Sequence, residues 1–115
     1  MESLASRSCR PCHGNVPRLT SEEIEPLLRQ LDGWDAAEEH HLLKAYKFSN
    51  FADALAFVGR VGQIAEWEGH HPDITFGWGY ARVKIYTHAI GGLSESDFIL
   101  AAKIDEGVMS DEKSG

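Results

Sequence analysis

Three of the six histidines in this chain lie within residues 66–88, at His70, His71 and His88. The unperturbed pKa of a histidine, about 6.5, leaves both protonation states populated near neutral pH. Two such side chains can therefore serve one reaction, in which one protonates a leaving group while the other removes a proton elsewhere. The end of a helix favours the charged imidazole and burial favours the neutral one, so different surroundings can assign the two roles. Residues 66–88 are thus a candidate acid–base site, with the acid and the base left open.

The segment between these histidines predicts a β-hairpin that brings them together. Alternating apolar residues on either side of Gly79 are typical of two short strands joined by a tight turn. Across such a hairpin the numbers of facing residues sum to about 158 or 159, which sets Thr87 and His88 opposite His70 and His71. Any one of these histidines alone would be interpreted as an ordinary hydrogen-bonding residue, but three together favour a function.

The spacing of the three histidines does not favour a metal centre. Adjacent residues in a strand face opposite sides, so His70 and His71 do not readily direct both rings to one ion. The stretch contains neither HxH nor HxxxH, and the obvious neighbouring carboxylates are those of Glu66 and Asp73. The chain also has no GxSxG, P-loop or GxGxxG sequence that would indicate a different chemistry. From the residues alone, a metal centre is therefore not the favoured interpretation, and acid–base chemistry by the histidines is.

The first half of the chain predicts a helix, a hairpin and a second helix. Thr20 and Glu23 form a capping box that opens a helix over residues 20–31, bent at Pro26. Strands at residues 34–37 and 41–48 follow, with His40 and His41 as exposed turn residues. Asn50 then caps a long helix that Gly69 ends, and small residues along it allow close packing against a sheet. Its predicted buried face consists of Phe51, Leu55, Val58, Val61 and Ala65, widened by Phe57 and Ile64.

The second half predicts two strands and a last helix. Pro72 keeps His71 extended, and period-two alternation continues over residues 73–78 and 81–88. A second capping-box-like run, residues 94–97, opens a helix to about Val108. The order α-β-β-α-β-β-α predicts an α+β fold, a four-stranded antiparallel sheet with the helices on one face. We expect one domain at residues 20–109, a loosely attached leader at 1–19 and a solvated tail at 110–115.

Composition excludes several classes of function. With a net charge of −7 and a pI near 5.2, the chain lacks the basic surface that direct nucleic-acid binding needs. No apolar run approaches the roughly 20 residues of a membrane span. The start, MESLASRS, has no apolar centre of a secretory signal, so we expect a cytoplasmic protein.

The two cysteines lie in the leader, in the sequence CRPCH at residues 9–13. This sequence matches the attachment pattern of c-type haem, but haem attachment goes with export and with a helix to pack on the ring. A zinc site would need further ligands besides Cys9, Cys12 and His13. The interpretation we prefer is a leader with two reduced thiols.

The pattern around the histidines resembles the signature of the pterin-4a-carbinolamine dehydratases. The matching positions are Glu66, His70, His71, Pro72, Trp78, His88 and Asp97, with every gap as in that signature. The predicted order of elements also resembles that fold, and the likeness covers about residues 18–109. The resemblance implies that the chain dehydrates a 4a-hydroxytetrahydrobiopterin to quinonoid dihydrobiopterin and water, in the recycling of tetrahydrobiopterin after an aromatic amino acid hydroxylase. It implies no metal and no organic cofactor.

The same resemblance implies roles for individual residues. His71 and His88 would form the acid–base pair, with His70 orienting the pterin and sharing in proton transfer. Substrate contacts would come from Glu66, Pro72, Thr87 and Ala89, the last through the backbone after His88. Two residues would support the site: Trp78 by packing at the end of the hairpin, and Asp97 by bonding to its N-cap.

Two departures and two alternatives accompany the resemblance. Relatives often carry an acidic or amide residue where this chain has Gly69, and an arginine where it has Ser96, so any pterin contact from those side chains is missing. A homodimer or homotetramer is implied, since an open sheet exposes edges that need covering. The alternative functions are a dimerisation cofactor of a transcription factor, which the acidic surface would suit, and a pterin-binding domain without turnover.

Overall fold

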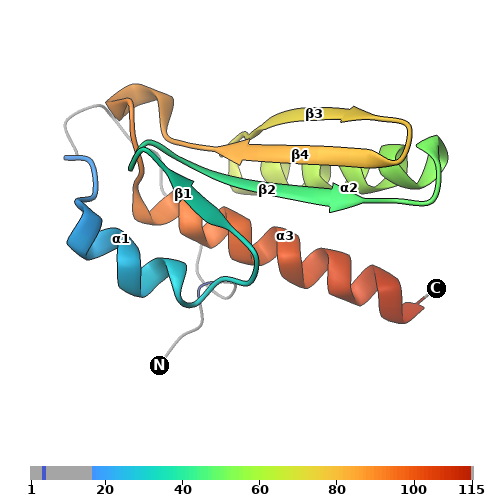
Figure 1. The fold of residues 1–115 in the computed structure, drawn as a ribbon, viewed down its shortest axis with the longest axis horizontal. Coiled ribbons are helices and arrows are strands. Elements are labelled where there is room, and N and C mark those ends of the chain that lie inside the picture. Colours follow the sequence, from blue (N-terminus) through green and yellow to red (C-terminus); the bar gives the residue numbers. More distant parts are fainter. Residues whose placement is uncertain (1–3, 5–16, 115) are drawn as a thin grey trace.

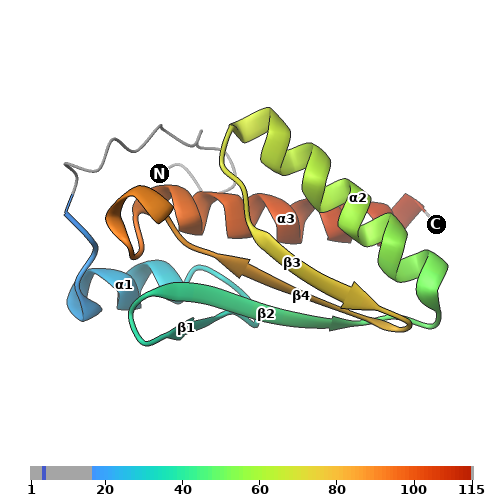
Figure 2. The ribbon, with the colours of Figure 1, turned by 90° about the horizontal axis from the view of Figure 1, so that it is seen from above.

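Three helices lie on one face of a four-stranded antiparallel sheet, as the two views of the ribbon show (Figures 1 and 2). The computed structural model describes residue 4 and residues 17–114. The elements in chain order are α1 (Ser21–Leu28), β1 (Asp35–Ala37), β2 (His41–Lys47), α2 (Phe51–Glu68), β3 (Asp73–Gly77), β4 (Tyr80–Ile85), the 3₁₀ turn η2 (His88–Ile90) and α3 (Glu95–Ser114). The α+β fold predicted from the sequence is confirmed, whereas Cys9, Cys12 and His13 lie outside the described residues.

The sheet has the order β1-β2-β4-β3, so β2 and β4 are central. Residues of β4 alternate strictly between the two faces. Ala81, Val83 and Ile85 point towards the helices and are fully buried, whereas Tyr80 and Arg82 point to the open face and are exposed. This alternation confirms the period-two pattern on which the strand was predicted.

The register of the β3–β4 hairpin differs from the predicted one. Gly77 pairs with Tyr80, not with Ala81 or Arg82, so the strands are shifted by one or two residues. The reason is the loop, which contains only Trp78 and Gly79, with Gly79 at φ +82. A two-residue loop closes the hairpin more tightly than a turn centred on Gly79 would. Trp78 therefore sits in the loop and is 72% exposed, so the expectation that it packs at the end of the hairpin is wrong for the single chain.

The starts of the helices were predicted closely, whereas the ends of the first and last helices were not. Thr20 and Glu23 bond reciprocally at the start of α1, and Asn50 caps α2 by accepting a hydrogen bond from the backbone of Asp53. The first helix ends at Leu28, three residues early, with Pro26 inside it. The last helix continues to Ser114, past the predicted end at Val108, because no proline interrupts that segment.

The predicted buried face of α2 is confirmed in part: Phe57, Val61 and Ala65 are buried and Val58 and Ile64 pack against the core, but Phe51 and Leu55 lie outside it. Ala54, Phe57, Val61 and Ala65 are buried, whereas Phe51 and Leu55 are 45% and 50% exposed. Apolar and small residues occupy more than one face of this helix, so periodicity identified most of the buried face but not its edge. The small residues that were expected against the sheet are mostly exposed, namely Ala52, Ala56 and Gly59, while only Ala54 is buried.

A polar cluster around Asp105 ties α3 to the β1–β2 hairpin. The Asp105 carboxylate accepts hydrogen bonds from Trp34 Nε1 at 2.8 Å, Lys44 Nζ at 3.0 Å and the Tyr46 hydroxyl at 3.2 Å. Lys44 also donates to the carbonyl of Asp32. Burial, followed by the charge of Asp105 and its hydrogen bond, raises the pKa of Tyr46 far above its usual value. The hydroxyl thus stays neutral. The polar groups of the cluster are hydrogen-bonded to one another, and the cluster has a structural role.

Among the described residues, no helix is both long and apolar enough to cross a membrane.

Gly69, the left-handed residue that ends α2, allows a test of how the chain enters the site. Its φ is +66, and a Cβ at this position would meet no atom within 4 Å. Gly69→Ala should therefore destabilise the fold by about 1 kcal/mol through backbone strain alone. Gly59, in the interior of α2, has equally open surroundings and no positive φ. Gly59→Ala should instead leave stability unchanged or raise it by up to about 1 kcal/mol. Urea denaturation measures both changes, and equal effects would contradict this account.

Candidate functional site

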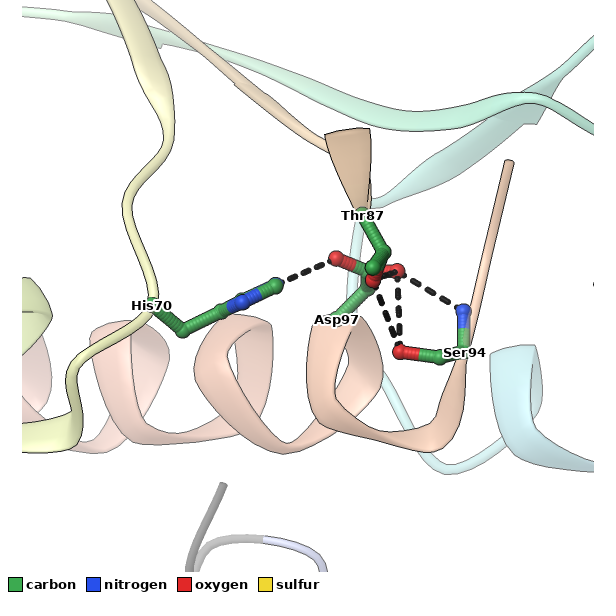
Figure 3. Close-up of polar contacts among 4 residues, drawn as sticks. All are labelled: His70, Thr87, Ser94 and Asp97. Carbon is green, nitrogen blue, oxygen red and sulfur yellow. Dashed lines mark hydrogen bonds and ion pairs between the residues drawn. The ribbon is translucent and has the colours of Figure 1, made fainter. Parts of the chain in front are cut away.

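The candidate site is built around Asp97, a carboxylate with no solvent exposure in the first turn of α3 (Figure 3). One oxygen, Oδ1, lies 2.6 Å from His70 Nε2. The other, Oδ2, accepts hydrogen bonds from the Thr87 hydroxyl at 2.9 Å and from the Ser94 backbone N–H at 2.8 Å. Because the Thr87 proton is used in this way, the 2.8 Å contact between the hydroxyls has Ser94 as its donor. The predicted bond between Asp97 and the N-cap of its own helix is confirmed.

This arrangement explains how a charge is tolerated in the core. A carboxylate buried without partners would cost several kcal/mol, but Asp97 has partners on both oxygens and lies at the positive end of a helix. The carboxylate accepts from His70, so the imidazole carries a proton on Nε2 and presents Nδ1 to its other neighbours. His70 is thereby fixed in tautomer and direction, with its side chain only 14% exposed.

His71 stands in different surroundings from its neighbour. Its Nε2 bonds to a carboxylate oxygen of Glu66, in the last turn of α2. Both side chains are largely exposed, at 59% for His71 and 77% for Glu66. The left-handed Gly69 and the extended segment at Pro72 separate the two histidines in this way. Adjacent imidazoles are consequently held by two different carboxylates, one buried and one at the surface.

His88 is held by an aromatic ring. It begins η2 and is exposed, and its imidazole stacks on Tyr86 with ring centroids 4.1 Å apart and an interplanar angle of 19°. Tyr86 also contacts His40, at 4.5 Å between centroids, and His40 Nδ1 lies 3.1 Å from His41 Nδ1. Burial, with the charges of Lys84 and His40, lowers the pKa of His41, while Glu38 acts in the opposite direction. The pair at the turn is thus half-buried, and not simply exposed as predicted.

The structure joins the predicted residues in three groups. His70, Thr87 and Asp97 form the first, His71 and Glu66 the second, and His88 belongs to a third with Tyr86. Among the described residues, no hydrogen bond or ring contact links His88 directly to His70 or His71. Of the other predicted positions, Ala89 is exposed, Pro72 half-buried and Trp78 remote in the hairpin loop.

Sequence reasoning missed two residues of the site, Ser94 and Tyr86. Ser94 had a detectable signal, because the run Ser94–Asp97 was interpreted as a capping box without a link to the histidines. Tyr86 had a weaker signal: the alternation over residues 81–88 placed it on the same side as His88, but nothing in the sequence placed His40 next to it. Ser96, where relatives often have an arginine, is buried at 5% exposure.

The described residues contain no group of three or more histidine, cysteine, aspartate or glutamate side chains that could hold a metal ion. What they offer is proton chemistry. One histidine is locked to a buried carboxylate, a second is paired with an exposed one, and a third stacks on a tyrosine. Such different surroundings are what a reaction needs when a proton is delivered at one atom and removed at another.

Comparison with known proteins agrees with this geometry. Residues 17–107 match the family described as pterin 4 alpha carbinolamine dehydratase. A protein of Rubrobacter xylanophilus is 55% identical over 91% of this chain and 98% of its own length, and one of Methylococcus capsulatus is 50% identical over 90% and 92%. Both carry the name "Putative pterin-4-alpha-carbinolamine dehydratase".

Two solved structures are similar as well. The crystal structure of a transcriptional coactivator/pterin dehydratase from Brucella melitensis has a TM-score of 0.72 and 31% identity, covering 78% of this chain and 97% of that one. A pterin dehydratase-like protein described as a RuBisCO assembly factor in the alpha-carboxysome has a TM-score of 0.56 at 24% identity, covering 66% and 89%, and shows a likeness of fold alone. With a family match over most of its length and relatives of 50% identity and above, this chain belongs to the pterin 4 alpha carbinolamine dehydratase family.

Proposed function

We propose that this protein is a dehydratase acting on a 4a-hydroxytetrahydrobiopterin. In the reaction the bond from C4a to its hydroxyl oxygen breaks, the hydroxyl leaves as water after gaining a proton, and N5 loses a proton to give the quinonoid dihydropterin. No electron is gained or lost. The observation that carries the proposal is the set of three histidines, each held by a different partner, in a chain of this family.

The three histidines divide the work according to their surroundings. His71 and His88 are exposed and can reach a bound substrate, so we assign the acid–base pair to them, without specifying which is the acid. The orientation of His70 is set by Asp97, which suits a residue that orients the pterin and shares in proton transfer. Glu66 holds the His71 imidazole in the same manner at the surface.

The proposed pterin contacts are Pro72, Thr87 and Ala89, which lie next to these histidines in the sequence, and Glu66, which bonds to His71. Thr87 is only 4% exposed and bonds to Asp97, so its larger part is to hold that carboxylate. The proposal places the protein in the cytoplasm, in tetrahydrobiopterin recycling after an aromatic amino acid hydroxylase. No step needs a metal or an organic cofactor.

We also propose that the protein is a homo-oligomer, as a dimer or tetramer. The outward face of α2 exposes Phe51, Leu55 and Trp67, with Trp67 88% exposed. A groove beside this face is lined by Ile64, Trp67, Lys103 and other residues of α2 and α3. Large apolar side chains so exposed on one helix are typical of a surface that a partner covers, and a second copy of α2 offers small residues, including Ala56 and Gly59, to receive them.

A dehydration assay on the purified protein tests the activity. The protein should accelerate loss of water from the 4a-carbinolamine without added metal, and chelator should not reduce the rate. His71→Ala should lower kcat by about a hundredfold or more, the usual contribution of a positioned acid or base. Asp53→Ala, at an exposed position at the other end of α2, should have no effect.

Two results would count against this assignment. A normal rate in His71→Ala would remove the role given to that residue, and loss of activity with chelator would point to metal chemistry. Wild-type protein that binds a reduced pterin without dehydrating it would favour the non-catalytic pterin-binding domain. Silence in both assays would favour a protein-binding function, of the kind that the words "transcriptional coactivator" describe for the Brucella protein.

Asp97→Asn tests the support beneath the site. The amide keeps the shape, but it replaces one acceptor oxygen by an NH₂ group that faces a donor and it removes the charge. The fold should therefore lose about 2 kcal/mol, the value of a hydrogen bond to a charged group. The rate should fall by at least about tenfold, because His70 loses its orienting carboxylate. Thermal melting and the dehydration assay measure the two effects. Glu106→Gln, an exposed change on the same helix, is the control, and a variant indistinguishable from it would refute the role of Asp97.

Leu55→Glu tests the proposed association through α2. A charge in the apolar face should give single chains of 12.8 kDa, because the glutamate cannot be desolvated without a partner. Light scattering after size-exclusion chromatography measures the mass. Thr75→Glu places the same charge on the open face of the sheet and should not alter it. A wild type that is already monomeric would show the association to be absent.

A further inference from the structure

Tyr86 lies at the centre of a group of side chains on the open face of the sheet. Its ring contacts His88, with centroids 4.1 Å apart, and His40, with centroids 4.5 Å apart. Lys84 Nζ lies 5.6 Å from the centre of the same ring. Ile85 and Thr87, on either side of Tyr86 in the chain, are buried under the opposite face. Tyr86 is therefore the residue of the open face that contacts His88.

The contact with the Tyr86 ring fixes the direction of the His88 imidazole. His70 and His71 are each directed by a carboxylate, whereas His88 is exposed and its one described side-chain partner is the Tyr86 ring. An acid or base acts only within hydrogen-bond reach of the proton that it moves, so its ring must be held in one direction. The face of an aromatic ring attracts a cation as well as packing on a neutral ring. A stack on Tyr86 can thus hold His88 both before and after proton transfer.

The turn between β1 and β2 places His40 against the Tyr86 ring, and two residues of this turn have an unusual backbone conformation. Glu38 and Glu39 both have φ +56, a left-handed conformation that residues other than glycine and asparagine seldom adopt. The backbone N–H of His40 donates to the carbonyl of Ala37 at 2.9 Å and closes the turn. Positive φ at both central residues is the pattern of the type I′ turns that join hairpin strands, so the β1–β2 hairpin itself imposes this conformation. Here the turn ends with the His40 ring packed on Tyr86.

We propose that Tyr86 is a positioning residue for His88, and that His40 secures Tyr86 from the β1–β2 turn. The contact itself does not depend on the proposed function, whereas the part of His88 in proton transfer does. It extends the site to two residues outside the signature, at the end of the sheet remote from the β3–β4 loop.

Three variants separate this role from a general effect on the fold. Tyr86→Leu removes the stacking ring, and Tyr86→Phe keeps it. Tyr80→Leu removes an exposed tyrosine at the other end of β4, whose ring contacts Arg82. Thermal melting identifies any variant that has lost its fold, and in that event His40→Ala, a change in the β1–β2 turn, replaces Tyr86→Leu.

The first readout is the NMR signal of the His88 ring in isotopically labelled protein, which requires no turnover. The ring current of Tyr86 should displace this signal in the wild type and in Tyr86→Phe and Tyr80→Leu, and the displacement should vanish in Tyr86→Leu. The second readout is kinetic. Tyr86→Leu should lower kcat by about tenfold or more with KM changed less than about twofold, as expected when a reacting group is misdirected and not removed. Tyr86→Phe and Tyr80→Leu should match the wild type.

The proposal is overturned if Tyr86→Leu leaves the His88 signal in place, or if the signal moves while kcat stays equal to that of Tyr80→Leu. An inactive wild type would refute the proposed dehydratase function and not, by itself, the contact. In that case the NMR comparison alone decides whether Tyr86 directs His88.

Discussion

The constraint on which the rest of this site depends is a single buried charge, the carboxylate of Asp97. It has no contact with solvent, so each of its oxygens needs a donor from the protein. The donors come from three separate parts of the chain: the link between α2 and β3 supplies His70, the segment that follows β4 supplies Thr87, and the residue before α3 supplies Ser94. Removing any one of these donors leaves part of the charge unsatisfied. The orientation of His70 and the stability of the core therefore depend on the same hydrogen bonds.

The residues that follow β4 continue the alternation of the strand, so the residue that supports Asp97 and the residues proposed for the chemistry lie on opposite sides. Thr87 points inward to Asp97, whereas Tyr86 and His88 lie on the open side. One face of the strand therefore belongs to the core and the other carries the solvent-facing residues. A shift of one residue in register would turn Thr87 outward and Tyr86 and His88 inward, which would remove both the support of Asp97 and the exposed histidine. The short loop at Trp78 and Gly79, which fixes that register, thus influences a site at the opposite end of the hairpin.

Much of the fold could be predicted because its signals are local. Thr20, Asn50 and Gly69 mark helix ends through hydrogen bonds and backbone angles within a few residues, and the alternation in β4 needs no knowledge of the rest of the chain. The pairing of Asp97 with its own N-cap was local in the same sense. The errors arose where a choice depends on distant contacts. Phe51 and Leu55 fit the predicted apolar stripe as well as Val61 and Ala65 do, and only packing against the sheet decides which of them are buried.

The same distinction applies to the candidate site. The pattern from Glu66 to Asp97 identified the histidines, but it could not show that adjacent imidazoles have separate carboxylates, or that His40 reaches Tyr86 from a turn far away in sequence. Both features follow from backbone conformation at a few points, Gly69 and Pro72 in the first case and Glu38 and Glu39 in the second. Glycine and proline indicate such points in a sequence, and two consecutive glutamates do not. A strained turn built from ordinary residues is therefore visible only in the structure, and here it lies directly beside the ring that holds His88.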